Sequence, residues 1–176
     1  TLGEEELKFV NLMSQCADNT DSDIARRTFY FWHILRKAVE DCPSTRMAKN
    51  AVLERAYTQV VVSSIKHLNC GHDYDELSEQ EAEDLRHLRN DVADALGDCS
   101  SVLGGDVCLI RIFEVLVAES QKTHPTWQGI EACLYGIRRI GRFVPSNEQT
   151  VLPQLFPLLG RLPQHHMLSY TAILVV

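Results

Sequence analysis

One stretch of this sequence, residues 78–105, shows nearly every mark of a single long amphipathic helix. Ser78 and Glu81 have the spacing of a capping box, in which each side chain satisfies a free backbone amide at the start of a helix. Apolar residues then recur every three or four positions, at Leu85, Leu88, Val92, Leu96, Cys99 and Leu103. Two glycines follow at positions 104 and 105, where a helix commonly ends.

A helix of about 25 residues is roughly 38 Å long, and its apolar face needs partners along that whole length. The flanking sequence supplies them, because helical patterns cover residues 3–17, 24–41, 44 or 45 to 68, 106–122, 126–141 and 151–159. We expect capping boxes at Thr20/Asp23 and Ser146/Gln149, and a last helix opened by Pro163. Pro153 and Pro157 predict that the helix around them is kinked or begins at Pro153.

The predicted fold class is all-α, because no segment with a strand-like pattern has a partner strand. Helices that recur every 20 to 30 residues, paired into antiparallel hairpins, fit the period of HEAT or armadillo arrays. We therefore expect an α-solenoid of HEAT-type hairpins that stack in sequence order. The start at Thr1 and the apolar end TAILVV favour a piece of a longer solenoid, with roughly three to four hairpins in residues 1–176.

The charge of the chain is acidic and unevenly distributed. The net charge is −7, which argues against direct nucleic-acid binding, since that depends on neutralising phosphates. Residues 73–98 contain ten acidic residues and two arginines, so almost all of the net charge lies there. A basic partner is expected instead. The longest apolar runs are far shorter than the roughly 20 residues that span a membrane, so no membrane segment is predicted.

Four segments together resemble one known family. They are TFYFWHIL at residues 28–35, RNDVADALGDCSSVLGGDVCL at 89–109, WQGIEACLYGIRRIGRFV at 127–144 and LPQHHMLSYTAIL at 162–174. In this order they resemble the middle of the transportin-3 and importin-13 branch of the importin-β (karyopherin-β) nuclear transport receptors. The sequence departs from that family's pattern at Pro153 and Pro157 and in the acidic loop near Asp73.

The resemblance implies a superhelix of HEAT repeats that carries protein cargo through nuclear pores under the control of the GTPase Ran. Receptors of this branch import proteins rich in Arg-Ser dipeptides, so the implied partners are such cargo, Ran and nuclear pore proteins. The implied localisation is shuttling between cytoplasm and nucleus. No cargo-binding or Ran-binding residue of the family can be matched to a position in this sequence. A HEAT-repeat scaffold or regulatory subunit outside nuclear transport is the alternative.

The sequence offers no set of residues for catalysis, a metal or a cofactor. Cys70 and His72 have a C-x-H spacing, but a structural zinc site needs four ligands and no second pair is suitably placed. Cys99 follows an aspartate, which raises rather than lowers a thiol pKa, so a core cysteine is favoured over a nucleophile. The six cysteines are spread singly, as in reduced proteins without disulfides. We expect no enzyme and no cofactor.

The candidate partner-binding site is the dense acidic run in front of and inside the start of the long helix. Such a run can be a solvated face that keeps the helix soluble, or a docking site for a basic partner. The candidate residues are Asp73, Asp75, Glu76, Glu79, Glu81 and Asp84.

Overall fold

The computed structural model describes residues 3–41, 51–69, 71, 76–162 and 164–175. Regular structure in these residues is entirely helical, which confirms the all-α prediction. The helices are α1 (Glu4–Ala17), α2 (Ser22–Asp41), α3 (Ala51–Leu68), α4 (Glu79–Leu103), α5 (Gly105–Ser120), α6 (Trp127–Ile140), α7 (Leu152–Leu159) and α8 (His166–Ile173), with a 3-10 turn, η2 (Gly141–Phe143), after α6.

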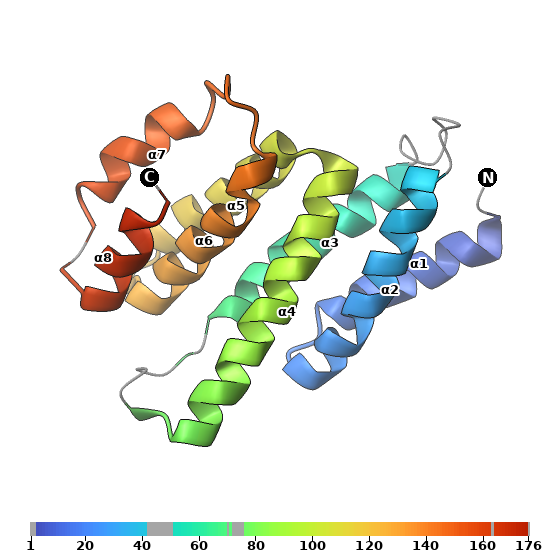
Figure 1. Cartoon of the computed structure of the whole chain (residues 1–176), viewed down its shortest axis with the longest axis horizontal. Coiled ribbons are helices and arrows are strands. Elements are labelled where there is room, and N and C mark those ends of the chain that lie inside the picture. The colour runs from blue at the N-terminus through green and yellow to red at the C-terminus, as the bar shows by residue number, and fades with distance from the viewer. Residues whose placement is uncertain (1–2, 42–50, 70, 72–75, 163, 176) are drawn as a thin grey trace.

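The helices stack in two layers that run from the N-terminus to the C-terminus (Figure 1). One layer contains α1, α3 and α5, each packed against the next. The other contains α2, α4, α6 and α8, packed in the same way. The antiparallel pairs α1–α2, α3–α4 and α5–α6 bridge the layers. This is the arrangement of an α-solenoid, in which each hairpin covers an apolar side of its neighbours.

Substantial contacts join only elements that are close in the stacking order. Helix α1 packs on α2 and α3, whereas α8 packs on α6, and the two ends of the chain lie at opposite sides of the molecule (Figure 1). The expectation that hairpins contact their sequence neighbours is therefore met by the described residues. The buried apolar side chains nevertheless form one continuous cluster, from Val10 in α1 to Ala172 in α8.

Helix α4 has the length and ends that its sequence predicts. It contains 25 residues, and its capping box is present: the Ser78 amide donates to Glu81 Oε2 at 2.8 Å, and the Glu81 amide donates to Ser78 Oγ at 3.3 Å. Gly104 ends the helix with φ at 94°, a conformation that other residues rarely adopt. Helix α5 then begins at once at Gly105.

Two other predicted capping boxes are wrong. Asp21, not Thr20, stands at the start of α2, where its Oδ1 accepts the Asp23 amide at 2.9 Å. Glu148 takes the place of the predicted Ser146/Gln149 pair, and its carboxylate accepts the amides of Thr150, Val151 and Leu152. In both cases an acidic residue next to the predicted cap forms the hydrogen bonds.

One proline of α7 lies in its first turn and the other in its interior. Pro153 occupies the first turn, where its missing amide costs nothing, and Pro157 lies inside the helix, which is only eight residues long. Helix α7 begins at Leu152, between the two predicted starts at Val151 and Pro153. Pro163 lies outside the described residues, and α8 begins at His166.

The two tryptophans differ in burial. Trp32 of α2 is fully buried, and its ring lies edge-on to the Tyr57 ring of α3, with the ring centroids 5.2 Å apart. Trp127 opens α6 and is only half-buried. Its ring stacks on the His165 ring, with the ring centroids 3.9 Å apart. Both tryptophans lie on the apolar stripes of their helices in the sequence, which predicts that both are buried. That prediction is confirmed for Trp32 and wrong for Trp127.

Candidate functional site

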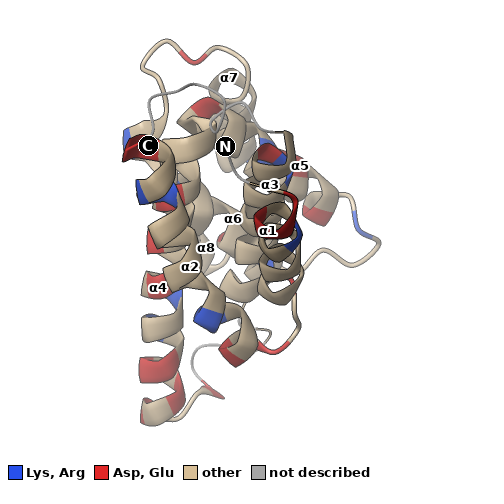
Figure 2. Ribbon diagram, turned by 90° about the vertical axis from the view of Figure 1, so that its right-hand side faces the viewer, with Lys and Arg blue, Asp and Glu red and all other residues tan. Residues whose placement is uncertain are grey.

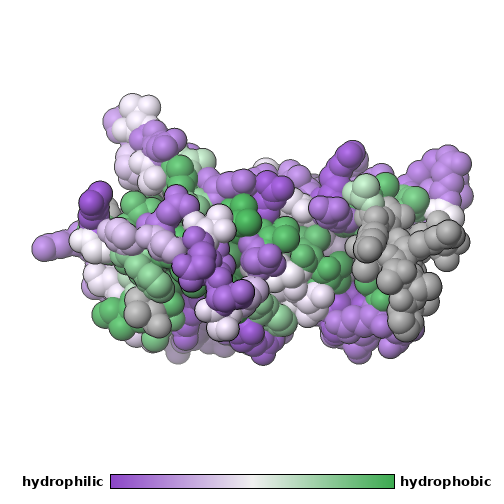
Figure 3. All heavy atoms as spheres, turned by 90° about the horizontal axis from the view of Figure 1, so that it is seen from above, coloured by the Kyte–Doolittle hydropathy of each residue, from purple (hydrophilic) through white to green (hydrophobic). Residues whose placement is uncertain are grey.

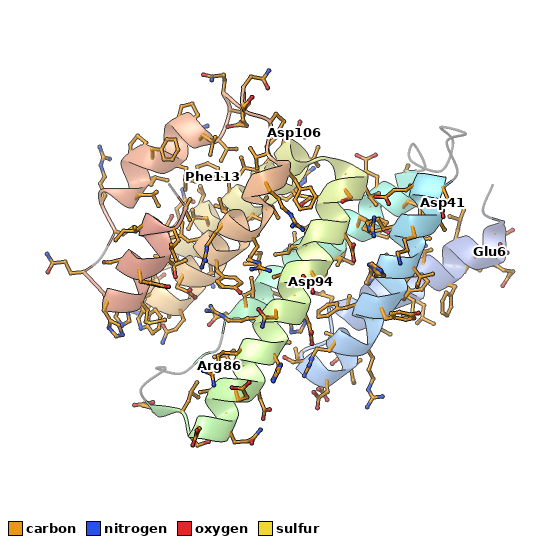
Figure 4. The ribbon with its side chains drawn as sticks, in the orientation of Figure 1. Glu6, Asp41, Arg86, Asp94, Asp106 and Phe113 are labelled. Carbon is orange, nitrogen blue, oxygen red and sulfur yellow. The ribbon has the colours of Figure 1, made fainter. Side chains whose placement is uncertain are left out.

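The start of α4 projects from the stack. Its first turns extend beyond the start of the neighbouring helix α2 (Figure 1). The acidic residues of α4 recur along its length and are densest in these first turns (Figure 2). Arg86 lies among them, whereas Asp94 lies on the middle of the helix (Figure 4). The acidic face that the sequence predicts is therefore exposed, and it is concentrated where α4 has the fewest neighbours.

The structure describes four of the six candidate residues. Glu76 is exposed just before the helix, and Glu79, Glu81 and Asp84 are exposed on its first two turns. These four residues are thus brought together on one end of α4. Asp73 and Asp75 lie outside the described residues.

Their carboxylates are not equally available to a partner. Glu81 is held by the capping box, in which it accepts both the amide and the hydroxyl of Ser78, the latter at 2.6 Å. Among the described residues, Asp84 accepts only from the neutral amide of Gln80, at 3.0 Å, and none of them cancels its charge. Glu79 and Glu76 form no hydrogen bond or ion pair with the described residues. Glu81 therefore has a structural role, and the other three carry the free charge.

Farther along α4, arginines of α2 neutralise two acidic residues, Asp91 and Asp98. Arg26 donates to Asp91 Oδ2 at 2.6 and 2.9 Å, and Arg36 donates to Asp98 Oδ1 at 2.6 Å. These pairs join two neighbouring helices of one layer. Asp94 is exposed between them and forms no ion pair with a described residue, and Arg86 pairs with Glu83 in the second turn of α4. The uncompensated negative charge is therefore concentrated at the start of α4, at Glu76, Glu79 and Asp84, but is not confined to it.

A groove of about 530 Å³ lies beside that start, and we call it the α4 groove. The turn between α1 and α2 forms one wall, the end of α3 forms the floor, and the first turns of α4 form the other wall. Asp23 and Asp84 face it from opposite walls. Its apolar lining comes from Leu77, Leu85 and Leu88, all half-buried.

Hydrogen bonds hold the floor of this groove to its wall. The buried His67 ring of α3 lies 3.1 Å from the carbonyl oxygen of Ala17 and 3.3 Å from the hydroxyl of Ser22. Both ring nitrogens thus have a partner on the α1–α2 turn. The turn is fixed in place before any ligand binds, which lowers the entropic cost of binding.

Asp18 adds a second tie at the same turn. Its burial acts to raise its pKa, but the Lys66 ammonium at 2.5 Å and the Ser63 hydroxyl at 2.8 Å outweigh that effect. The net result is a lowered pKa, so Asp18 stays ionised and paired with Lys66. Asp18 therefore neutralises the Lys66 ammonium in the floor of the groove.

The sequence indicates the acidic run but not the groove. Asp23 is 61 positions from Asp84, and only the stacking of hairpins brings their two helices together. Leu85 and Leu88 read as part of the buried face of α4, yet both are half-buried, whereas Val92 and Leu96 on the same face are fully buried. The signal that could have shown this is the greater length of α4 compared with α2.

The described residues give no support for a nucleophilic cysteine or for a metal site. Burial raises the pKa of the Cys108 thiol to about 11 and of the Cys133 thiol to about 12. Burial, with Cys108 and Asp98 nearby, raises the Cys99 pKa as well, so these thiols are poor nucleophiles. Across the described part of the chain, no three His, Cys, Asp or Glu side chains are grouped as a metal site requires. Cys70 and His72 are outside that part.

Comparison with known proteins gives the same family as the four sequence segments. Residues 2–67 match the family model of the Transportin-3/Importin-13 second TPR domain. Transportin MOS14 of Arabidopsis thaliana is 29% identical over the whole chain. The family model and the named relatives agree on similarity to the transportin-3/importin-13 branch. The mRNA transport regulator MTR10 of Saccharomyces cerevisiae is 26% identical over 95% of the chain, and an uncharacterized protein of Schizosaccharomyces pombe is 32% identical over 96%.

The chain spans about a fifth of the length of these relatives: 19% of the fission yeast protein, 20% of the plant transportin and 17% of the budding yeast regulator. No solved structure matches the chain significantly. None of the described helices is long and apolar enough to cross a membrane.

Proposed function

We propose that this chain is a central HEAT-repeat segment of a nuclear transport receptor, which carries protein cargo through nuclear pores under the control of the GTPase Ran. The observation that supports this most is the extent of the similarity, since proteins named as transportin and as mRNA transport regulator align with 95 to 100% of the chain. The layered hairpins agree with it, because a solenoid presents long surfaces to protein partners.

The proposed partners are cargo rich in Arg and Ser, Ran and nuclear pore proteins, and the receptor would shuttle between cytoplasm and nucleus. The acidic start of α4 suits a basic partner of this kind. Glu76, Glu79 and Asp84 are exposed and carry uncompensated charge. The sequence places two more acidic residues, Asp73 and Asp75, directly before Glu76. Contacts between exposed charges are worth about 0 to 1 kcal/mol each, but a dense cluster also speeds encounter with a basic ligand.

Binding of Ran to the full-length protein is the first test. We expect Ran loaded with GTP to bind more tightly than Ran loaded with GDP, and to change the affinity for a peptide of Arg-Ser repeats. By linkage, the peptide must change the affinity for Ran by the same factor. Calorimetry with each ligand alone and then with both measures this. Absence of Ran binding would favour a HEAT-repeat scaffold outside transport.

Charge removal tests the acidic site. A variant of the full-length protein carrying Asp73→Asn, Asp75→Asn, Glu76→Gln, Glu79→Gln and Asp84→Asn keeps Glu81, because Glu81 caps the helix. It should bind the Arg-Ser peptide more slowly and with a flatter salt dependence, since screening acts on fewer charges. The matched control removes five exposed acidic charges elsewhere: Glu4, Glu5, Asp41, Glu54 and Glu114. Equal effects of both variants would show a general charge effect and no site.

A further inference from the structure

Among the described residues, no helix covers the apolar wall of the α4 groove. Leu85 and Leu88 continue the face of α4 that buries Val92 and Leu96 completely. At the start of α4 that face looks over the α1–α2 turn, and the two leucines remain half-buried beside the groove. Leu77 adds a third half-buried apolar side chain. An aliphatic side chain that entered the groove would remove these surfaces from water, which is favourable.

The apolar wall of the α4 groove lies in a concave part of the surface. Seen from above the stack, hydrophobic and hydrophilic side chains are interspersed (Figure 3). In the groove the three leucines lie together within a concave space of about 530 Å³. That volume is in the range of pockets that hold a few side chains, and too small for a folded domain.

The charges around the leucines are complementary to a cation. Arg26 and Lys66 line the groove, but Asp91 binds the first and Asp18 binds the second. Asp84 accepts only from a neutral amide, and the carboxylate of Asp23 forms no hydrogen bond with any described residue. Two uncompensated carboxylates therefore stand on opposite walls, and Leu85 and Leu88 share the α4 wall with Asp84.

We propose that the α4 groove binds an extended protein segment in which one large aliphatic residue, such as leucine, is flanked by arginine or lysine. The aliphatic side chain packs on Leu85 and Leu88, and the flanking cations pair with Asp23 and Asp84. This inference rests on the proposed function, since it specifies the basic partner of the acidic start of α4. It adds selectivity, because a basic segment without the aliphatic residue gains only contacts that salt screens.

Two labelled peptides test the proposal against the full-length protein. Both contain twelve residues of alternating Arg and Ser, and one has Leu in place of a central Ser. We expect the Leu peptide to bind about tenfold more tightly, as burial of one leucine side chain implies. The ratio should persist at 0.5 M salt, although both affinities fall. Fluorescence anisotropy measures all four values.

Substitutions in the groove locate the effect. Leu85→Ser should bring the ratio of the two affinities close to one, and because Leu85 is half-buried the fold should tolerate the change. Asp23→Asn should weaken both peptides by the same factor and leave the ratio unchanged. Ile173→Ser, at an exposed position of α8, is the matched control and should change neither affinity.

The outcomes separate this inference from the proposed function. If both peptides bind equally well, or if Leu85→Ser leaves the ratio of the two affinities at its starting value, the proposed contact of the aliphatic side chain is refuted. The proposed basic partner is not refuted by that result. If neither peptide binds, the proposed basic partner fails together with that contact. Circular dichroism of each variant shows whether it keeps its helical content.

Discussion

Arg89 of α4 and Glu131 of α6 form a buried ion pair that joins two successive hairpins. Arg89 Nη1 lies 3.3 Å from Glu131 Oε1, and Nη2 contacts the other carboxylate oxygen. Thr171 of α8 donates to the same Oε1 at 2.8 Å, and the guanidinium lies over the Tyr135 ring at 4.6 Å. One carboxylate thus connects three consecutive helices of a single layer.

Removal of one partner of this pair should destabilise the chain strongly. Glu131→Leu leaves the Arg89 charge buried without its carboxylate, which costs about 3 to 5 kcal/mol. The double variant Arg89→Met with Glu131→Leu should recover most of the loss, since a well-packed apolar pair replaces a buried ion pair at little cost. Urea denaturation of the two single variants and the double variant measures both effects. Additive losses would show that the two side chains do not act as a pair.

The two tryptophans should differ in their contribution to stability. Trp32→Ala empties a fully buried site and removes the hydrogen bond from Trp32 Nε1 to Thr28 Oγ1, so we expect a loss of about 3 to 5 kcal/mol. Trp127→Ala removes a half-buried ring and its stack on His165, and should cost no more than about half as much. Chemical denaturation compares them. Similar losses would mean that Trp127 is buried as deeply as Trp32.

Gly105 is a position where no larger residue fits. A Cβ atom there would lie 2.1 Å from the carbonyl oxygen of Phe143, so the start of α5 packs directly on the backbone of η2. Gly105→Ala should cost about 1 to 3 kcal/mol, because backbone must move to make room. Gly97→Ala is the control, since a Cβ there has ordinary contacts no nearer than 3.6 Å, and alanine favours a helix interior by about 0.5 to 1 kcal/mol. Thermal melting of both variants should give opposite shifts.

Local sequence chemistry predicts most of the fold but misplaces some of its details. The capping box of α4 is present as predicted, and the helix expected to start at residue 126 does begin there, with Thr126 as its N-cap. At the start of α2 and α7 several polar residues compete, and tertiary packing decides which turn is the first. Asp21 and Glu148 form these caps for that reason.

The site is less predictable than the fold. The acidity of residues 76–84 is visible in the sequence, but Leu85 and Leu88 have the same helical spacing as the fully buried Val92. Their partial exposure depends on how far the neighbouring hairpin reaches, which is a property of two segments about 60 residues apart. The opposite carboxylate, Asp23, reaches the groove by the same stacking.

Glu148 should make part of the stability depend on pH. Desolvation acts to raise its pKa, but the amides of Leu152, Val151 and Thr150 outweigh it, and the net shift is downward. A carboxyl whose pKa is lower in the folded chain stabilises the fold above its unfolded pKa of about 4.3, and that stabilisation is lost as the pH falls through the folded value. Glu148→Gln should therefore cost about 0.5 to 1 kcal/mol at pH 7, as loss of a helix cap does, and much less at pH 3.

Urea denaturation between pH 7 and pH 3 tests this, with Glu114→Gln as the control because Glu114 pairs with the exposed Arg111 side chain and not with backbone amides. A loss from Glu148→Gln that stays constant across this range would show that the charge of Glu148 adds nothing to the cap.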